Sequence, residues 1–514
     1  MLSVAKASAG AQSRDAGRIH AMLVVVSDLH LTDGTSAPST ALSAFELFVE
    51  QLRQAATGAS WRSDGHYRPL ERLDVLLLGD TLDLLHSSRW LDATVRPWDS
   101  PQQPELIELV TQIGHDVLAH NVAGLELLRK VTSGGELLIP AADTTGRPAS
   151  GGASQRVRVV LHCLVGEHDW FLHLPGRLFD PLRQAVARQL GLAQDAAEPL
   201  AHEPGENEAL ADVLRRHRVL ARHGDQFDPL AFAGDRQVSS LSDALAIELV
   251  VRFVAAVANQ LAEDLPAATL LGLRELENVR PVLLVAQWLD GLLARTCSKP
   301  ALRSRVRALW EDCVERLLAT TLVASHARGT PRLIDGLAGT LSLARRASAA
   351  WGAKSAALVE PWRETTGGSY ARLALTEPEF RSRRAKYVVY GHTHLAESVP
   401  LEASYTEGYV LNQIYFNAGT WRRTQHATLA TRPEPEFVAS DVATLLAFYQ
   451  GDERGGRPYE CWSRTLGVGA IELPQLRVDP AAQSARAALS EGHPLAAPHF
   501  MAGAAQRLVP RRRS

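Results

Sequence analysis

Short apolar runs that each end in a cluster of polar residues constrain the fold of this chain more than any other feature. The runs have the length and the apolar character of buried strands. Helical patterns separate the early runs, for example over residues 40–55 and 105–131. Strand, polar loop and helix in repetition predict an α/β fold with helices on both faces of a sheet. The runs with their polar ends cover residues 21–31, 72–83, 156–169, 218–228, 386–395 and 414–421.

The pattern changes between the fourth and the fifth run. Residues 242–265 form a long Ala-rich stretch that is apolar on one face, and Pro266 ends it. Further helical patterns follow, and no strand signal accompanies them. We therefore expect an α-helical insertion, or cap, within the sheet domain, although these helices could also flank one large domain. The additional helical patterns cover residues 281–296, 301–324 and 331–351.

These patterns divide the chain into segments. The sheet domain is expected in two pieces, residues 21–229 and 385–480, on either side of an insertion over residues 230–384. The Ala-rich end of the chain, which finishes in RLVPRRRS, predicts a solvated, disordered tail over residues 481–514. A disordered N-terminus is expected over residues 1–20.

Composition and charge favour an ordinary globular protein. Of 514 residues, 46% are hydrophobic and 22% are charged, and the formal net charge is −3. This charge indicates neither a nucleic-acid partner nor an anionic membrane surface. No uninterrupted apolar run of about 18 residues occurs, so no membrane span is expected. The first 20 residues lack the apolar core of a signal peptide, and the expected location is the cytoplasm.

The polar clusters carry the chemistry. Each has a structural interpretation when taken alone, because aspartates cap helices and turns and histidines can be structural. Every cluster, however, follows an apolar strand, and α/β sheets collect functional groups at the carboxyl ends of their strands. Together the clusters predict a metal site, whose carboxylate and imidazole ligands suit Mn, Fe or Zn better than Mg. They read D-x-H from Asp28, G-D-x-x-D from Gly79, G-x-H-D from Gly166, H-G-D from His223 and G-H-T-H from Gly391.

In these motifs and their order the chain resembles the calcineurin-like metallophosphoesterase superfamily, over about residues 22–228 and 386–473. The segment NAGTW, residues 417–421, is similar to the final strand and loop of that family. The resemblance implies a four-layer αββα sandwich of two mixed β-sheets with a dinuclear metal site at the strand ends. It also implies hydrolysis of a phosphoester, whether a monoester, a diester or a pyrophosphate, by a hydroxide that bridges two divalent cations.

The resemblance further implies a role for each candidate residue. His168 would contact the phosphate or act as the general acid that protonates the leaving group, and Asp83 and Asp169 would orient its ring. The metal ligands comprise one bridging carboxylate, three ligands of a first cation and three ligands of a second cation. They are Asp80; Asp28, His30 and His394; and Glu167, His223 and His392.

The chain departs from the family at Glu167, where other members have an asparagine. Three carboxylates, from Asp28, Asp80 and Glu167, against two divalent cations leave one net positive charge, whereas an asparagine would leave two. The smaller charge should weaken the binding of a dianionic monoester. We therefore expect a tighter second metal, with a preference for diesters, pyrophosphates or a more charged metal. An alternative is that Glu167 points away from the site and a water takes its place as ligand.

Other differences from the family pattern indicate which branch of the superfamily the chain resembles. Leu84 and Leu85 stand where Ser/Thr phosphatases of the superfamily have an arginine. SDLHL and GHTH are more similar to bacterial branches, including UDP-2,3-diacylglucosamine pyrophosphatase. That enzyme has an arginine at the position of His168, which argues against a role in lipid A synthesis.

The expected substrate is a small phosphoester or a nucleotide-like molecule. The insertion could be a lid that selects this substrate, or it could serve packing and formation of a homo-oligomer. A second hypothesis keeps the phosphoesterase fold without its catalysis, as a scaffold protein. A third, a peripheral membrane enzyme, depends only on the apolar helices of the insertion.

Overall fold

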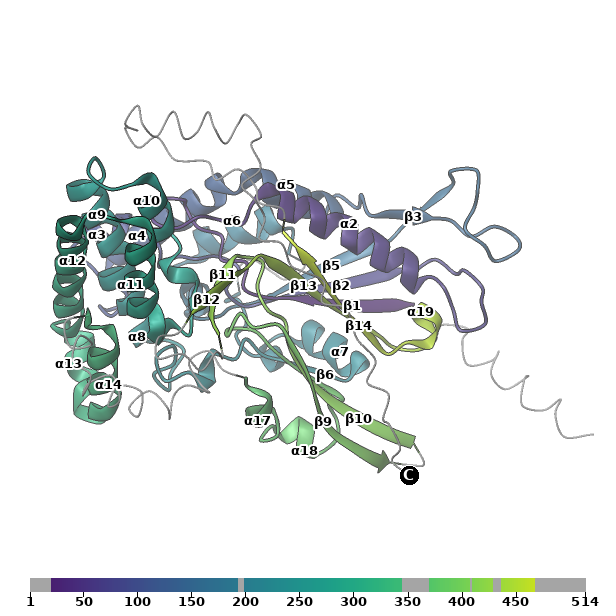
Figure 1. Cartoon of the computed structure of the whole chain (residues 1–514). Helices are drawn as coiled ribbons and strands as arrows, with labels where there is room; N and C mark the ends of the chain where they lie inside the picture. The colour runs from purple at the N-terminus through teal and green to yellow at the C-terminus, as the bar shows by residue number, and fades with distance from the viewer. Residues whose placement is uncertain (1–19, 193–197, 344–368, 407–408, 429–435, 467–514) are drawn as a thin grey trace, which may run out of the picture. The chain divides into compact units, whose positions relative to one another are not determined.

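The computed structural model describes most of the chain (Figure 1). The segments predicted to be disordered, residues 1–20 and 481–514, lie outside the described residues apart from His20. The same holds for residues 467–480 of the predicted sheet domain and residues 344–368 of the predicted insertion. The described ranges are 20–192, 198–343, 369–406, 409–428 and 436–466.

A mixed sheet of five strands has the order β14-β13-β1-β2-β5. The three strands β1, β2 and β5 are parallel, whereas β13 pairs antiparallel with β1 and β14 pairs antiparallel with β13. The central strand β1 is buried along its whole length, which explains its unbroken apolar sequence AMLVVV. The bounds are β1 (Ala21–Val26), β2 (Arg72–Leu78), β5 (Arg158–Leu164), β13 (Val442–Tyr449) and β14 (Tyr459–Thr465).

A second mixed sheet has the order β6-β8-β10-β9. Its strands β6, β8 and β10 are parallel, and β9 pairs antiparallel with β10. The bounds are β6 (Val219–Ala221), β8 (Tyr387–Tyr390), β9 (Glu397–Thr406) and β10 (Tyr409–Asn417).

Alternate residues of β1 pack on opposite sides of the first sheet. Leu23 and Val25 share a core cluster with Val389 and Phe416 of the second sheet. Their neighbours, such as Val24, pack in a different cluster with helices that lie over β1, β2 and β5 (Figure 1). These helices are α2 (Leu42–Ala59), α4 (Pro104–His120), α5 (Val122–Val131) and α6 (Asp180–Leu190).

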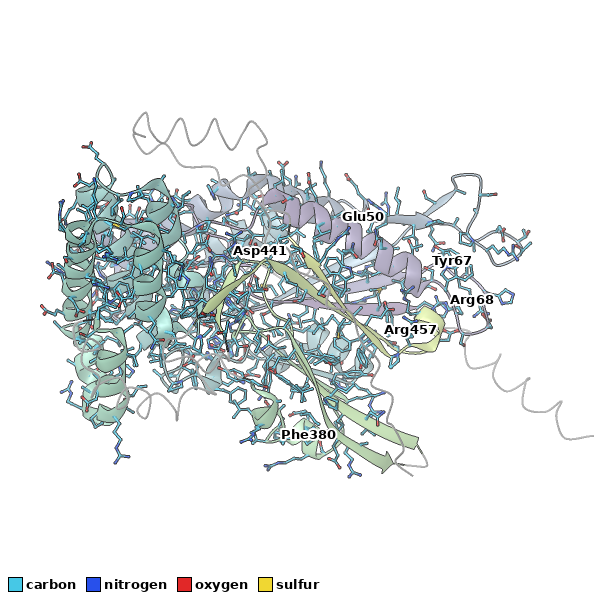
Figure 2. The ribbon with its side chains drawn as sticks, in the orientation of Figure 1. Glu50, Tyr67, Arg68, Phe380, Asp441 and Arg457 are labelled. Atoms are coloured by element: carbon cyan, nitrogen blue, oxygen red, sulfur yellow. The ribbon has the colours of Figure 1, made fainter. Side chains whose placement is uncertain are left out.

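The other face of the second sheet is covered by short helices, α17 (Ala371–Ala374) and α18 (Pro378–Arg381). Val388 and Tyr415 of the sheet pack there with Phe380 of α18, which Figure 2 labels. The described chain is therefore a mixed α/β structure with several mixed sheets, which confirms the predicted class at this level.

The predicted insertion is mainly helical, with its own apolar core from Leu230 to Leu343. Ala246 and Ile247 belong instead to the core cluster that Val24 shares with α2, α4, α5 and α6, so the insertion packs against the sheet region. No described helix is long and apolar enough to cross a membrane. The helices are α8 (Leu241–Ala244), the π-helix η4 (Leu245–Val251), α9 (Arg252–Leu261), α10 (Ala267–Leu273), α11 (Val285–Thr296), α12 (Pro300–Leu318), α13 (Thr321–Gly329) and α14 (Pro331–Leu341).

One strand interrupts this helical region, where the sequence indicated none. The two-residue strand β7 (Val279–Arg280) pairs with β11 (Thr424–Ala427), which pairs in turn with β12 (Phe437–Ser440). The remaining elements are α3 (Arg89–Asp92), β3 (Leu138–Pro140), β4 (Ser154–Arg156), η1 (Trp170–His173), η2 (Pro204–Glu206), α7 (Glu208–His217), η3 (Asp225–Phe227), η5 (Leu276–Asn278), η6 (Val282–Leu284) and α19 (Glu453–Gly456).

Candidate metal centre

The candidate residues lie in the loops that follow five parallel strands, three of the first sheet and two of the second. Of the seven candidate ligands, six are buried and His392 is partly exposed. The loops bring all seven into two adjoining clusters joined by Asp80. The residues follow β1 (Asp28, His30), β2 (Asp80, Asp83), β5 (Glu167, His168, Asp169), β6 (His223) and β8 (His392, His394).

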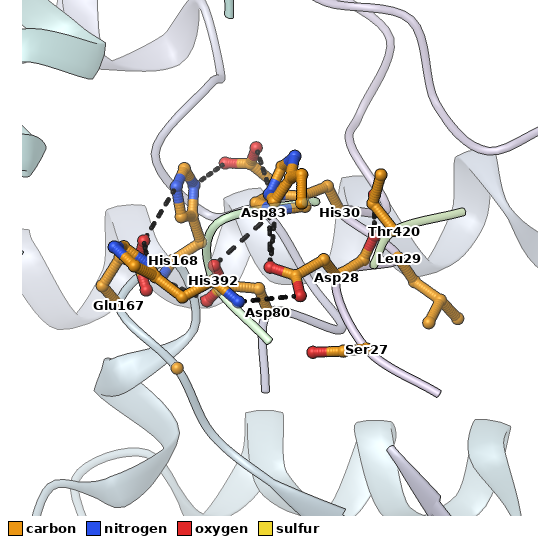
Figure 3. Close-up of polar contacts among 12 residues, drawn as sticks. Ser27, Asp28, Leu29, His30, Asp80, Asp83, Glu167, His168, His392 and Thr420 are labelled. Atoms are coloured by element: carbon orange, nitrogen blue, oxygen red, sulfur yellow. Dashed lines mark hydrogen bonds and ion pairs between the residues drawn. The ribbon is translucent and has the colours of Figure 1, made fainter. Parts of the chain in front are cut away.

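The first cluster consists of Asp28, His30 and His394. The Nε2 atoms of His30 and His394 lie 3.0 Å apart, and Asp28 Oδ1 lies 3.2 Å from His394 Nε2. The same oxygen is 3.6 Å from His30 Nε2. Two imidazoles and one carboxylate therefore direct their ligand atoms at a common point, and Figure 3 shows Asp28 and His30 of this cluster.

The second cluster consists of Glu167, His223 and His392. Glu167 Oε2 lies 2.8 Å from His223 Nε2, and Glu167 Oε1 lies 2.7 Å from His392 Nδ1. Burial alone would raise the pKa of Glu167, but the two imidazoles hold it well below its ordinary value. The Glu167 side chain therefore points into the site, in contrast to the alternative in which it turns away (Figure 3).

Asp80 contacts a histidine of each cluster. Its Oδ2 lies 3.2 Å from His223 Nε2 and 3.6 Å from His30 Nε2. Its Oδ1 accepts a hydrogen bond of 2.8 Å from the backbone N–H of His168. This is the placement expected of a carboxylate that bridges two cations.

Strained backbone is concentrated at these residues. Five of the eight described non-glycine residues with positive φ are candidate ligands. Such conformations cost roughly 1–3 kcal/mol each and persist where the surroundings enforce them. The five are Asp28 (φ 55°), His30 (45°), Asp80 (48°), His392 (65°) and His394 (58°).

The glycines of two motifs make room for the ligands. A Cβ at Gly391 would come within 2.6 Å of Asp28 Oδ2. A Cβ at Gly166 would come within 2.6 Å of His223 Nε2. Both positions therefore require glycine because ligand side chains occupy the adjacent space.

His168 stands beside both clusters. Its Nδ1 lies 3.1 Å from Asp83 Oδ1, and its Nε2 lies 4.0 Å from Glu167 Oε1. Burial lowers the pKa of His168, but Asp83 and Asp80 outweigh it and raise the pKa to about 10. Asp83 therefore forms an ion pair with this ring (Figure 3).

Asp169 requires a correction. Its Oδ1 accepts a hydrogen bond of 2.7 Å from the N–H of Gly166, and its Oδ2 accepts bonds from the N–H groups of Thr81 and Leu82. Burial and the nearby Asp80 raise the pKa of Asp169 to about 7. Asp169 therefore ties the loop after β5 to the loop after β2, and it does not orient His168 as we expected.

Sequence reasoning missed two side chains that contact the ligands. Asp228 Oδ2 lies 3.1 Å from His392 Nε2, and Arg280 Nη2 lies 3.1 Å from His394 Nε2. Asp228 is the last residue of the run over residues 218–228, and this position was the only sequence feature that could have indicated its contact with the site. Arg280 comes from the insertion and belongs to none of the motifs.

Asn417, in the NAGTW segment, forms hydrogen bonds with the loop that carries His392 and His394. Its side-chain amide donates to Gly391 O at 2.8 Å and to Thr393 Oγ1 at 3.0 Å. These bonds fix the backbone between His392 and His394. The similarity of this segment to the family was the signal that could have found the contact.

The donor set fits divalent cations. Asp28 Oδ1 and Asp80 Oδ2 are buried and accept no hydrogen bond within the described structure, so both face the histidine nitrogens. Each three-residue set has its ligand atoms within 4.8 Å of one another. Imidazole with carboxylate ligation suits Mn, Fe or Zn.

Comparison of the whole chain with protein-family models, with curated proteins and with solved structures found no match.

Proposed function

We propose that this chain is a dinuclear metal-dependent phosphoesterase with the four-layer αββα sandwich of the calcineurin-like metallophosphoesterases. The single observation that carries the proposal is the convergence of seven carboxylate and imidazole side chains from five strand-end loops. The positive φ angles of five of these residues support it, because strained backbone is concentrated at functional sites.

The first cluster would hold one cation, the second cluster would hold another, and Asp80 would contact both. Mn, Fe or Zn fits these ligands best. When bound, two divalent cations would polarise the phosphoryl group and supply an activated water as nucleophile.

His168 would act as the general acid. Asp83 Oδ1 lies 3.1 Å from its Nδ1, whereas its Nε2 lies on the side of Glu167. A proton held at Nε2 could pass to the leaving oxygen as the ester bond breaks. The carboxylates of Asp83 and Asp80 favour the protonated ring.

The charge of the site favours diesters and pyrophosphates over dianionic monoesters. Glu167 brings a third carboxylate to the two cations, and Asp228 adds a fourth beside His392. Because these carboxylates lower the net positive charge of the site, a phosphoryl group with two negative charges loses more attraction than one with a single charge.

Metal content and hydrolysis test the proposal together. We expect two Mn or Zn ions per chain by plasma mass spectrometry, with turnover of bis(4-nitrophenyl) phosphate. Chelation should remove both the metal and the turnover, and Mn²⁺ should restore them. A metal-free protein that hydrolyses neither this diester nor 4-nitrophenyl phosphate would contradict the proposal and favour a scaffold role.

A further inference from the structure

A pocket of about 90 Å³ opens beside His168 and has two kinds of wall. The polar wall is the metal centre itself, including Glu167 and His392, together with Arg280. The predicted insertion contributes Ser242 and Glu277 to the lining together with an apolar wall. The residues of this apolar wall are Leu230, Ala231, Leu245, Ala246, Val250 and Val282.

Arg280 gives the polar wall a fixed positive charge. Its guanidinium Nη1 donates to the carbonyl oxygens of Glu277 and Val279, at 2.6 and 3.1 Å. Its Nη2 reaches His394 Nε2 at 3.1 Å. Pairing of Arg280 with His426, between β7 and β11, holds this backbone beside the sheets.

The π-helix η4 builds much of the apolar wall, through Leu245, Ala246 and Val250. π-helical turns are rare in proteins, and those that occur are often found at functional sites. This one is anchored to the rest of the molecule, because Glu248 accepts a bond of 2.6 Å from Arg96 Nε. The wall therefore has a defined position relative to His168.

We propose that this pocket recognises a phosphoester that carries a small apolar ester group. Arg280 binds an anionic phosphoryl oxygen, and the wall of η4 and Val282 packs against the hydrocarbon. This pocket is smaller than the apolar cavity of roughly 150 Å³ that accommodates benzene, and the phosphoryl group takes up part of it, so only a short hydrocarbon group fits. This inference names the substrate class of the proposed phosphoesterase and rests on that proposal.

Binding of alkyl phosphonates tests the pocket without turnover. Methyl-, propyl- and decylphosphonate are titrated by calorimetry into the full chain loaded with Mn²⁺. We expect propylphosphonate to bind about tenfold more tightly than methylphosphonate, because two more methylene groups leave water. Decylphosphonate should bind no more tightly than propylphosphonate, because the pocket is full.

Two variants separate the two walls. Val250→Thr combined with Val282→Thr keeps the side-chain shape, and should reduce the propyl-to-methyl ratio to about threefold or less while leaving methylphosphonate within about twofold. The same change at the exposed Val438 is the matched control and should keep the full ratio. Arg280→Gln should weaken every phosphonate by about tenfold and preserve the ratio.

Equal affinity of the wild-type chain for methyl- and propylphosphonate would overturn the inference, and so would no binding of either. If phosphoesters are hydrolysed but methyl- and propylphosphonate bind equally tightly, only the inference about the pocket fails. If the series shows the expected ratio but no phosphoester is hydrolysed, the pocket stands and the proposed hydrolysis fails.

Discussion

The two clusters of the candidate centre have the same composition, one carboxylate and two histidines, but opposite electrostatic surroundings. His394 of the first cluster contacts the guanidinium of Arg280, whereas His392 of the second lies between Glu167 and Asp228. Burial and then Arg280 hold the pKa of His394 well below its ordinary value. Burial also opposes charge on His392, but Glu167 and Asp228 raise its pKa to about 10.

These histidines are two residues apart in one motif, so the difference is not local in sequence. It arises from residues that the fold brings to each side, an arginine of the insertion and two carboxylates of the sheet region. The second cluster should therefore bind a divalent cation more tightly than the first.

The largest effect is expected for Asp80→Asn, because Asp80 contacts both clusters. Loss of the shared carboxylate should release at least one cation and reduce hydrolysis of bis(4-nitrophenyl) phosphate by about a thousandfold or more. Metal content and turnover are measured on the same preparation. Asp441→Asn, which removes a partly exposed partner of Arg423, is the control and should keep both.

The next largest effect is expected for Asp74→Asn, which changes a buried carboxylate outside both clusters. This variant should affect the stability of the fold and not the candidate centre. Asp74 pairs with Arg72 and His162 inside the first sheet. Burial would raise the pKa of Asp74, but these partners lower it, so its contribution is present above about pH 4 and lost as pH falls further. Asp74→Asn should reduce the free energy of unfolding by about 3 kcal/mol at pH 7.

Denaturant unfolding at pH 7 and pH 3 measures this contribution, and the difference between Asp74→Asn and wild type should shrink at the lower pH. The variant should keep its metal. A stability loss that is the same at both pH values would assign the effect to packing rather than to charge.

Glu167→Asn should change substrate preference. Restoring one positive charge at the second cluster should raise the monoester-to-diester ratio of kcat/KM by about tenfold. The ratio is measured with 4-nitrophenyl phosphate and bis(4-nitrophenyl) phosphate. An unchanged ratio would mean that the Glu167 carboxylate does not set the charge felt by the phosphoryl group.

Arg280→Gln should have the smallest effect of these variants. It should increase the affinity for metal, whereas it should decrease the affinity for phosphonates. Removal of the guanidinium from His394 should increase the affinity of the weaker Mn²⁺ site by about threefold, measured by two-site calorimetric titration. Arg274→Gln is the control, because Arg274 donates to Gly34 O in the same region of the insertion. Equal affinities in wild type would contradict the difference between the clusters.

The sequence predicted which residues come together in the candidate centre because the signal is local. Each motif directly follows an apolar strand, and parallel strands deliver the residues that follow them to one edge. The sequence pattern did not predict the direction of every side chain, since Asp169 accepts hydrogen bonds from three backbone N–H groups where we expected it to orient His168. Arg280 was missed because its distance from His394 depends on how the insertion packs.

The most direct test of a dinuclear centre is an anomalous-scattering map of crystals grown with Mn²⁺. We predict two peaks, one against Asp28, His30 and His394 and a stronger one against Glu167, His223 and His392, with Asp80 contacting both. A single peak, or a Glu167 carboxylate that does not contact the second peak, would contradict this account.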